Sequence, residues 1–363
     1  MKRILPLLGG LLLAVTALTA RATEYQLPAD KSRVIGENVT YVVPDDGRSL
    51  EAIAAEYGIG LLAMLEANPG TDPYLPKPGS ELIIPSQLIL PDTPHQGIVI
   101  NLAELRLFYY PKGTNTVRVY PIGIGQLGRD TPIMTTSVSQ LIKDPTWTPT
   151  TNIRKAYAAQ GITLPAVVPA GPENPMGLFA LRLAHGRGEY LIHGTNADFG
   201  IGMRVSSGCI RLRPDDIEAL FKTIPKGTRV QIVNEPVKYT VEPDGQRYVE
   251  VHQPLSRNKN DDPQTMPITR SAGLTSFIQS PDTNSAIVEQ AIARRSGMPV
   301  NVSRDAQYKQ EAVPAEKTNF APVEMDEEAE VKALNLQPAD FAPGQLTQPG
   351  RLSVRKKARN NHP

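Results

Sequence analysis

A short apolar run, Tyr190-Leu191-Ile192, leads into His193-Gly194-Thr195 and then into Ser206-Ser207-Gly208-Cys209-Ile210-Arg211, so that the cysteine follows the histidine by 209 − 193 = 16 positions. Cys209 is the only cysteine in 363 residues. A lone thiol cannot form an intramolecular disulfide, so it is a buried apolar group, half of an intermolecular bridge, or a reactive group.

Residues 1–22 have the pattern of a cleavable signal peptide. Met1-Lys2-Arg3 is basic, the run from Ile4 to Leu18 is apolar, and Ala20-Arg21-Ala22 has the form of a cleavage site. The run is shorter than the roughly 20 residues that cross a bilayer, although an uncleaved anchor remains an alternative. We therefore expect an exported protein with no stable membrane insertion. An oxidising compartment converts idle thiols into unwanted disulfides, which favours a functional role for the single cysteine.

Composition excludes some functions. The chain has 38 Lys and Arg against 37 Asp and Glu, a net charge of +1, which gives no electrostatic case for binding nucleic acid. Proline accounts for 34 of 363 residues, about 9% against an average near 5%, which favours loop-rich β structure and an extended tail. The 363 − 22 = 341 residues after the signal peptide suffice for two compact domains plus flexible sequence.

Residues 39–85 predict a small domain in the order strand, helix, helix, strand. The first strand is Tyr41-Val42-Val43, Ser49 caps a helix that Gly58 ends, and a second helix precedes Asn68-Pro69-Gly70 and the strand at 82–84. The segment resembles a LysM module, which implies binding to glycan that contains N-acetylglucosamine. The turn Gly47-Arg48-Ser49-Leu50 departs from the family's Gly-Asp-Thr-Leu. A packing domain that has lost its ligand is the alternative.

Residues 97–233 predict a mainly β domain. Alternating or apolar runs mark strands at 98–100, 105–109, 117–120, 179–183, 190–192 and 229–233, and one helix is expected from Pro214 through Phe221. The proline-rich stretch from Lys143 to Gly177 is too long for an ordinary connection, and such loops are often functional lids. Trp147, near its start, is our candidate for contact with substrate.

Residues 234–300 predict a C-terminal extension in which the strand pattern decays after about Val251. One short helix is expected from Ser285 to Arg295. Residues 301–363 combine an acidic run, scattered prolines and a basic end, which predicts a disordered tail.

The thiol requires a base, because an unperturbed cysteine is mostly protonated at neutral pH. His95, His252 and His362 fall outside the strand-rich stretch, which leaves His185 and His193. His193 ends an apolar strand where a loop begins, a common position for catalytic residues, whereas His185 precedes a glycine-rich hairpin turn. We favour His193; the alternative for either residue is a structural histidine.

A cysteine and a histidine together suit covalent acyl transfer, in which the thiolate attacks a carbonyl and the imidazolium then protonates the leaving amine. Backbone amides of the turn formed by Ser207, Gly208 and Cys209 are candidates for an oxyanion hole. Arg211 is a candidate to lower the thiol pKa and to hold a substrate carboxylate.

The histidine, the cysteine motif, Asn174-Pro175-Met176-Gly177 and Gly227-Thr228-Arg229-Val230 resemble the L,D-transpeptidase catalytic domain, also called YkuD, across about residues 97–233. The resemblance implies a YkuD-like β-sandwich. It implies that Cys209 is the nucleophile, that His193 is the base, and that the Gly194 carbonyl orients the imidazole. Many members have histidine where this chain has Ser207. The serine form resembles an enterobacterial branch, which implies a periplasmic enzyme.

This resemblance implies attack on the bond between meso-diaminopimelate and D-alanine in a peptidoglycan tetrapeptide stem, in cell wall organisation and the maintenance of cell shape. The acceptor amine is a lysine of Braun's lipoprotein or the diaminopimelate of another stem, and both stay open. The chemistry requires no metal or organic cofactor, and no metal-ligand cluster is visible in the sequence. The rival functions are an L,D-carboxypeptidase, which passes the acyl group to water, and a wall-binding protein without catalysis.

Overall fold

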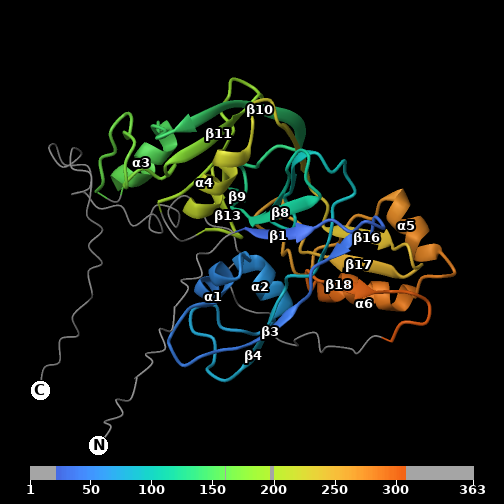
Figure 1. Ribbon diagram of the computed structural model, residues 1–363. Helices are drawn as coiled ribbons and strands as arrows, with labels where there is room; N and C mark the ends of the chain where they lie inside the picture. Colours follow the sequence, from blue (N-terminus) through green and yellow to red (C-terminus); the bar gives the residue numbers. More distant parts are fainter. Residues whose placement is uncertain (1–21, 160, 197–199, 308–363) are drawn as a thin grey trace, which may run out of the picture.

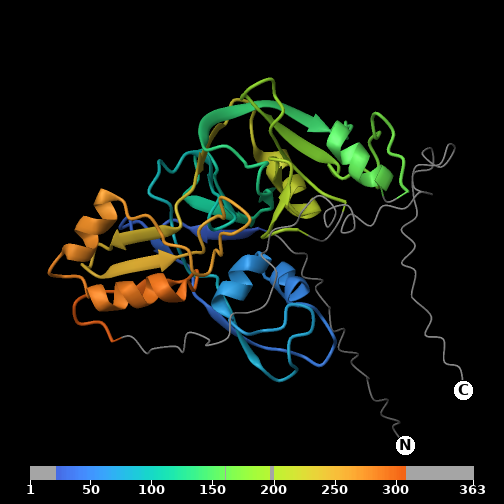
Figure 2. The ribbon, with the colours of Figure 1, turned by 180° about the vertical axis from the view of Figure 1, so that it is seen from behind.

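The computed structural model of the protein describes residues 22–159, 161–196 and 200–307. In these ranges the chain forms a small N-terminal α+β domain, a mainly β domain, and a C-terminal α+β part (Figure 1 and, from behind, Figure 2). The predicted signal peptide, apart from Ala22, lies outside the described residues. Within the described ranges, no helix is both long and apolar enough to cross a membrane.

The N-terminal domain has the predicted order of strand, helix, helix and strand. Strand β3 (Val39–Val42) pairs antiparallel with β4 (Glu81–Ile84), and α1 (Leu50–Glu56) and α2 (Leu61–Ala67) lie between them in the chain. The Ser49 hydroxyl accepts a hydrogen bond from the Ala52 amide at 3.2 Å, so the predicted helix cap is confirmed.

Among the described residues, nine strands form the main sheet, in the order β1-β8-β7-β6-β15-β10-β11-β12-β14. Their bounds are β1 (Thr23–Gln26), β6 (Gly97–Asn101), β7 (Arg106–Tyr110), β8 (Thr116–Pro121), β10 (Met134–Lys143), β11 (Phe179–Leu183), β12 (Leu191–His193), β14 (Ile210–Arg211) and β15 (Arg229–Val233). Every strand that the sequence predicted between 97 and 233 is present.

Strand β10 folds the sheet over itself. It pairs with β15 through Met134–Ser137 and with β11 from Val138 onward, and its register shifts between Val138 and Gln140. A bulge of this kind bends a strand and increases its twist. Apolar side chains from both halves of the sheet therefore share one core, which also receives Ile217 and Leu220 from helix α4 (Pro214–Thr223). The prediction of a mainly β domain with few helices is confirmed.

Shorter elements complete this domain and connect it to its neighbours. They are β2 (Val34–Ile35) paired with β5 (Leu88–Ile89), β9 (Ile124–Gly125) paired in parallel with β13 (Arg204–Ser206), and helix α3 (Thr151–Ala159).

The C-terminal part is more ordered than the sequence indicated. Strands β16 (Val237–Val241), β17 (Arg247–Val251) and β18 (Pro299–Asn301) form an antiparallel sheet, and helices α5 (Ala272–Gln279) and α6 (Ser285–Arg294) share a core with it. The helix expected at 285–295 is present, whereas α5 and the strands β16, β17 and β18 were not predicted. The tail was predicted to begin at residue 301, but β18 ends at Asn301 and the described residues extend to 307, so the first residues of the predicted tail belong to this part. The remainder of the tail lies outside the described residues.

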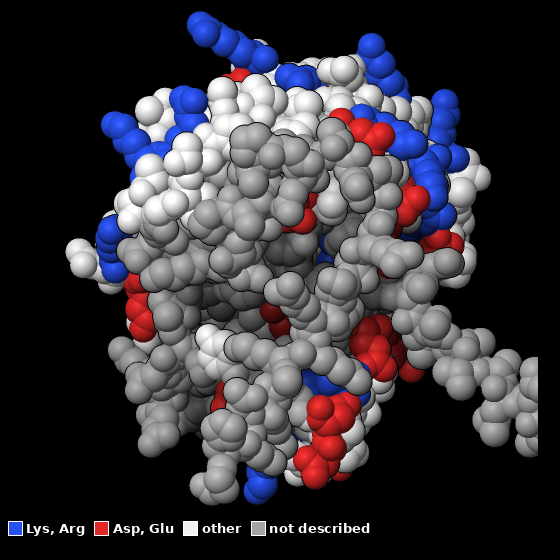
Figure 3. Space-filling view, turned by 90° about the vertical axis from the view of Figure 1, so that its left-hand side faces the viewer, with Lys and Arg blue, Asp and Glu red and all other residues white. Residues whose placement is uncertain are grey.

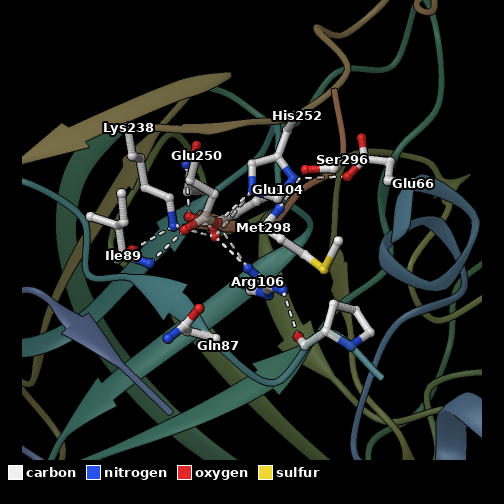
Figure 4. Close-up of polar contacts among 12 residues, drawn as sticks. Glu66, Gln87, Ile89, Glu104, Arg106, Lys238, Glu250, His252, Ser296 and Met298 are labelled. Atoms are coloured by element: carbon white, nitrogen blue, oxygen red, sulfur yellow. Dashed lines mark hydrogen bonds and ion pairs between the residues drawn. The ribbon is translucent and has the colours of Figure 1, made fainter. Parts of the chain in front are cut away.

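Six ionisable side chains meet where the three parts of the chain join. They are Glu66 of α2, Glu104, Arg106 of β7, Lys238 of β16, Glu250 of β17 and His252 (Figure 4). The His252 ring lies between two carboxylates, with Nδ1 2.9 Å from Glu66 and Nε2 2.7 Å from Glu250. Burial alone would lower the pKa of His252, but these carboxylates raise it to about 9. The imidazolium therefore links the N-terminal and C-terminal parts.

The sequence showed no metal-ligand cluster, but the fold brings Glu104, Glu250 and His252 together with ligand atoms within 4.8 Å of one another. Lys238 Nζ lies 2.7 Å from Glu104 and 2.9 Å from Glu250, so an ammonium group already stands between the two carboxylates. We therefore assign the cluster to an internal ion network rather than to a metal site.

The N-terminal domain also contacts the segment that leads to the cysteine. The amides of Leu61 and Leu62, in the first turn of α2, donate to the carbonyls of Ile201 at 3.4 Å and Gly202 at 3.2 Å. Arg213 Nη2 donates to the Ile59 carbonyl at 2.7 Å. These contacts fix the module beside the strand β13 that precedes Cys209.

The described surface carries charges of both signs. Figure 3 shows basic and acidic side chains on the same face, in keeping with the net charge of +1.

Candidate active site

Cys209 and His193 lie at the ends of neighbouring strands. Strands β12 and β14 are parallel, with Ile192 opposite Ile210 and His193 opposite Arg211, so Cys209 directly precedes the strand that runs beside the histidine. The thiol is partly exposed, whereas His193 is buried at 4% exposure. The tertiary structure therefore brings together the two residues that the sequence selected.

The thiol is held between backbone groups. Its Sγ lies 3.6 Å from the Glu189 carbonyl, to which it donates, and the Leu191 amide also hydrogen-bonds to the sulfur. Burial raises the pKa of the Cys209 thiol, while the Leu191 amide and the charge of Arg211 act in the opposite direction. The resting cysteine is thus a protonated thiol that needs a base.

The His193 ring is oriented by the carbonyl of the next residue. Nδ1 lies 2.6 Å from the Gly194 oxygen. A carbonyl oxygen only accepts hydrogen bonds, so Nδ1 carries the ring proton and Nε2 keeps its lone pair. Burial, reinforced by the charge of Arg211, lowers the pKa of His193 to about 3. The imidazole is therefore neutral at physiological pH, and the same low pKa makes it a weak base in the resting site.

One of the predicted oxyanion donors in the turn before the cysteine already has a hydrogen-bond partner within the turn. The Gly208 amide, a candidate oxyanion donor, instead donates to the Ser206 hydroxyl at 3.2 Å, and that hydroxyl donates to the Cys209 carbonyl at 2.5 Å. Gly208 has φ +104°, and a Cβ there would lie 3.2 Å from the Tyr190 ring. Only glycine suits this position without strain. Of the candidate amides in this turn, the Gly208 N–H is thus already engaged.

Ser207 is exposed and accepts a hydrogen bond from Arg129 Nη1 at 2.9 Å. The guanidinium group of Arg129 therefore lies beside the Gly-Cys pair. Sequence inspection missed Arg129 because 78 residues separate it from Ser207.

Arg211 is buried at 5% exposure, and its backbone amide and carbonyl both bond to Gly123 at 2.8 Å. The predicted role of Arg211 in holding a substrate carboxylate stays a prediction. The positive charge of Arg211 helps to keep His193 neutral.

The segment 143–177 is anchored at its base. The buried Asn174 side chain donates to the carbonyls of Pro145 at 2.8 Å and Pro169 at 3.0 Å, and Met176 hydrogen-bonds through its backbone to His193. Helix α3 within this segment was not predicted. Trp147 is partly buried and pairs with Val168 across an isolated bridge, so its contact with substrate stays a prediction.

The other histidines lie in surroundings different from those of His193. His185 is exposed in the hairpin turn, and its ring lies 5.5 Å from that of Tyr190. His95 stacks on Tyr110, and His252 belongs to the ion network. His362 lies outside the described residues.

Three family models match this chain. The family model described as the L,D-transpeptidase catalytic domain matches residues 95–232, a LysM domain model matches 41–85, and an L,D-transpeptidase C-terminal domain model matches 236–302.

Curated relatives match along most of their length. The Escherichia coli protein named "Probable L,D-transpeptidase YcfS" is 60% identical over 290 residues, which cover 79% of this chain and 91% of that protein. The Salmonella typhimurium protein named "Probable L,D-transpeptidase ErfK/SrfK" is 54% identical over 307 residues, 84% of this chain and 98% of that protein. The Escherichia coli protein named "Probable L,D-transpeptidase YbiS" is 56% identical over 289 residues, 78% of this chain and 94% of that protein.

Proposed function

The chain belongs to the L,D-transpeptidase family, and from this premise we propose that Cys209 cleaves the bond between meso-diaminopimelate and D-alanine in a tetrapeptide stem and passes the acyl group to an amine. The observation that carries the proposal is the placement of a protonated thiol and a neutral imidazole at the ends of neighbouring strands, with the imidazole Nδ1 hydrogen-bonded to the Gly194 carbonyl. Such a pair can transfer one proton from sulfur to Nε2 as the sulfur attacks.

The steps follow from these protonation states. His193 Nε2 takes the thiol proton, the sulfur attacks the carbonyl carbon of diaminopimelate, and the protonated ring then gives the proton to the amine of the leaving D-alanine. A thioester remains on Cys209. An acceptor amine attacks it, a new amide forms, and the thiol regains a proton. General acid–base assistance of this kind is typically worth about 10² to 10⁴-fold.

We further propose that the acceptor is a lysine of Braun's lipoprotein or a diaminopimelate of a second stem, and that the reaction takes place in the periplasm. The cleavable leader predicted at residues 1–22 supports export. The match to the LysM family supports attachment to peptidoglycan. The module is packed beside strand β13, and this places it close to the proposed nucleophile.

The test incubates the exported chain, residues 23–363, with purified tetrapeptide muropeptides, in the presence and absence of an amine acceptor, and follows the products by mass spectrometry. We expect loss of D-alanine and a new amide to the acceptor. Tripeptide as the sole product would instead favour the carboxypeptidase. Covalent labelling by a carbapenem, read by intact mass, reports acylation of the thiol directly.

Three variants locate the chemistry, and the last of them is the control. Cys209→Ala should abolish both turnover and the carbapenem adduct, and an adduct that survives in this variant would contradict the assignment. His193→Ala should lower turnover by about 10² to 10⁴-fold. His185→Ala changes an exposed histidine in the hairpin turn and should leave turnover close to wild type.

A further inference from the structure

The loop between β9 and β10 packs against the turn that carries the nucleophile. Strand β9 runs parallel to β13, the Gln126 amide donates to the Ser206 carbonyl at 2.8 Å, and the Arg129 amide closes the loop on Gln126 at 2.9 Å. A Cβ on Gly125 would lie 2.2 Å from the Arg129 carbonyl, so only glycine permits this fold of the loop. The loop is thus held in one conformation beside Cys209.

Thr131, at the end of this loop, makes two hydrogen bonds through one buried hydroxyl. Its Oγ accepts from the Gly125 amide at 3.0 Å and donates to the Gly208 carbonyl at 3.0 Å, and the residue is 5% exposed. The directions are unambiguous, because an amide only donates and a carbonyl only accepts. The single hydroxyl proton is therefore committed to Gly208.

The Gly208 carbonyl and the Cys209 amide belong to the same peptide unit. The described residues contain no cis peptide bond, and in a planar trans unit the C=O and the N–H point in opposite directions. Fixing the carbonyl toward Thr131 therefore aims the Cys209 N–H away from Thr131. The neighbouring Gly208 N–H is already given to Ser206. Of the Gly208 and Cys209 amides, the Cys209 N–H is therefore the one available for an oxyanion.

We propose that Thr131 is a positioning residue that aims the Cys209 amide at the oxyanion formed when Sγ attacks the substrate carbonyl. This inference rests on the proposed function. Thr131 touches no substrate atom and acts through the Gly208 carbonyl. Donors aimed at the oxyanion before reaction stabilise the tetrahedral intermediate, and loss of one such donor costs about 10² to 10³ in turnover.

Two reactions of the same thiol separate this role from a general effect on the cysteine. Acylation by a carbapenem passes through a tetrahedral oxyanion. Alkylation by iodoacetamide displaces iodide at a saturated carbon and forms no oxyanion. A residue that aims the oxyanion donor affects the first reaction and leaves the second unchanged, whereas a change in thiol pKa or in access would alter both.

The experiment measures both rates on wild type, Thr131→Val and Thr131→Ser in the exported chain, with alkylation followed from pH 6 to 10. Valine keeps the shape and removes the hydroxyl, and serine keeps the hydroxyl. We expect Thr131→Val to acylate about 10²-fold more slowly with an unchanged alkylation profile, and Thr131→Ser to acylate within a few-fold of wild type. Thr131→Ala serves if the valine variant does not fold.

Equal acylation of Thr131→Val and wild type would overturn the inference, and so would a parallel fall of both rates or a shifted alkylation profile. A wild-type protein that no carbapenem acylates and that converts no muropeptide would instead overturn the proposed function itself, so the two failures are distinguishable.

Discussion

Replacing Lys238 by Met should strongly destabilise the protein, because Lys238 belongs to the buried ion network. The Lys238 side chain is fully buried, and its ammonium group contacts Glu104 at 2.7 Å and Glu250 at 2.9 Å. The network holds three carboxylates against Arg106, Lys238 and a protonated His252, which balances its charge. Methionine fills most of the space and leaves one buried negative charge uncompensated.

The magnitude follows from the cost of breaking a buried ion pair. Removal of one partner typically costs about 3 to 5 kcal/mol, because the remaining charge stays desolvated. At about 2 to 4 °C per kcal/mol for a chain of this order of size, the midpoint of thermal unfolding should fall by roughly 6 to 20 °C. Burial alone would raise the pKa of Glu250, and Lys238 is the strongest of the groups that hold it at about 2. Without Lys238 a carboxyl group should take up a proton more readily, so the loss should shrink toward acidic pH.

The assay is thermal and urea unfolding of wild type and Lys238→Met at pH 5 and pH 8. Lys222→Met is the matched control, because Lys222 pairs with Glu218 at 2.6 Å but is 65% exposed. An exposed pair one helical turn apart contributes about 0.3 to 0.5 kcal/mol. A loss in Lys238→Met no larger than in the control, or a loss that grows toward acidic pH, would refute the reasoning.

Two further predictions concern pH. Because the pKa of His252 is raised from 6.5 to about 9, its contribution to the free energy of unfolding should be complete below pH 6.5 and disappear as pH rises through 9, a change of about 3 kcal/mol that urea unfolding at pH 6 and 10 measures and that His252→Gln should flatten. Because the pKa of Cys209 is raised, alkylation of the thiol by iodoacetamide should still be accelerating at pH 9, where an ordinary thiol is already mostly ionised; a plateau below pH 8 would contradict this.

Local sequence was sufficient to predict a helix or a strand wherever a pattern of side chains is repeated along one segment. Alternating apolar residues marked strands such as 179–183, and the Ser49 cap and Gly58 marked the ends of a helix. Strand β10 escaped notice because its sequence is rich in Thr and Ser, and its side chains are mostly half-buried or exposed. Helix α5 was not predicted, because it is short and follows a polar segment.

The sequence by itself selected Cys209 and His193, since a single thiol, a histidine at a strand end and their spacing are all local features. The tertiary structure alone decided which groups surround them. Arg211 proved buried, Gly208 gave its amide to Ser206, and Thr131 reached the Gly208 carbonyl across 77 residues. Hydrogen bonds and ion pairs depend on distances between atoms in space, and separation along the chain does not determine those distances.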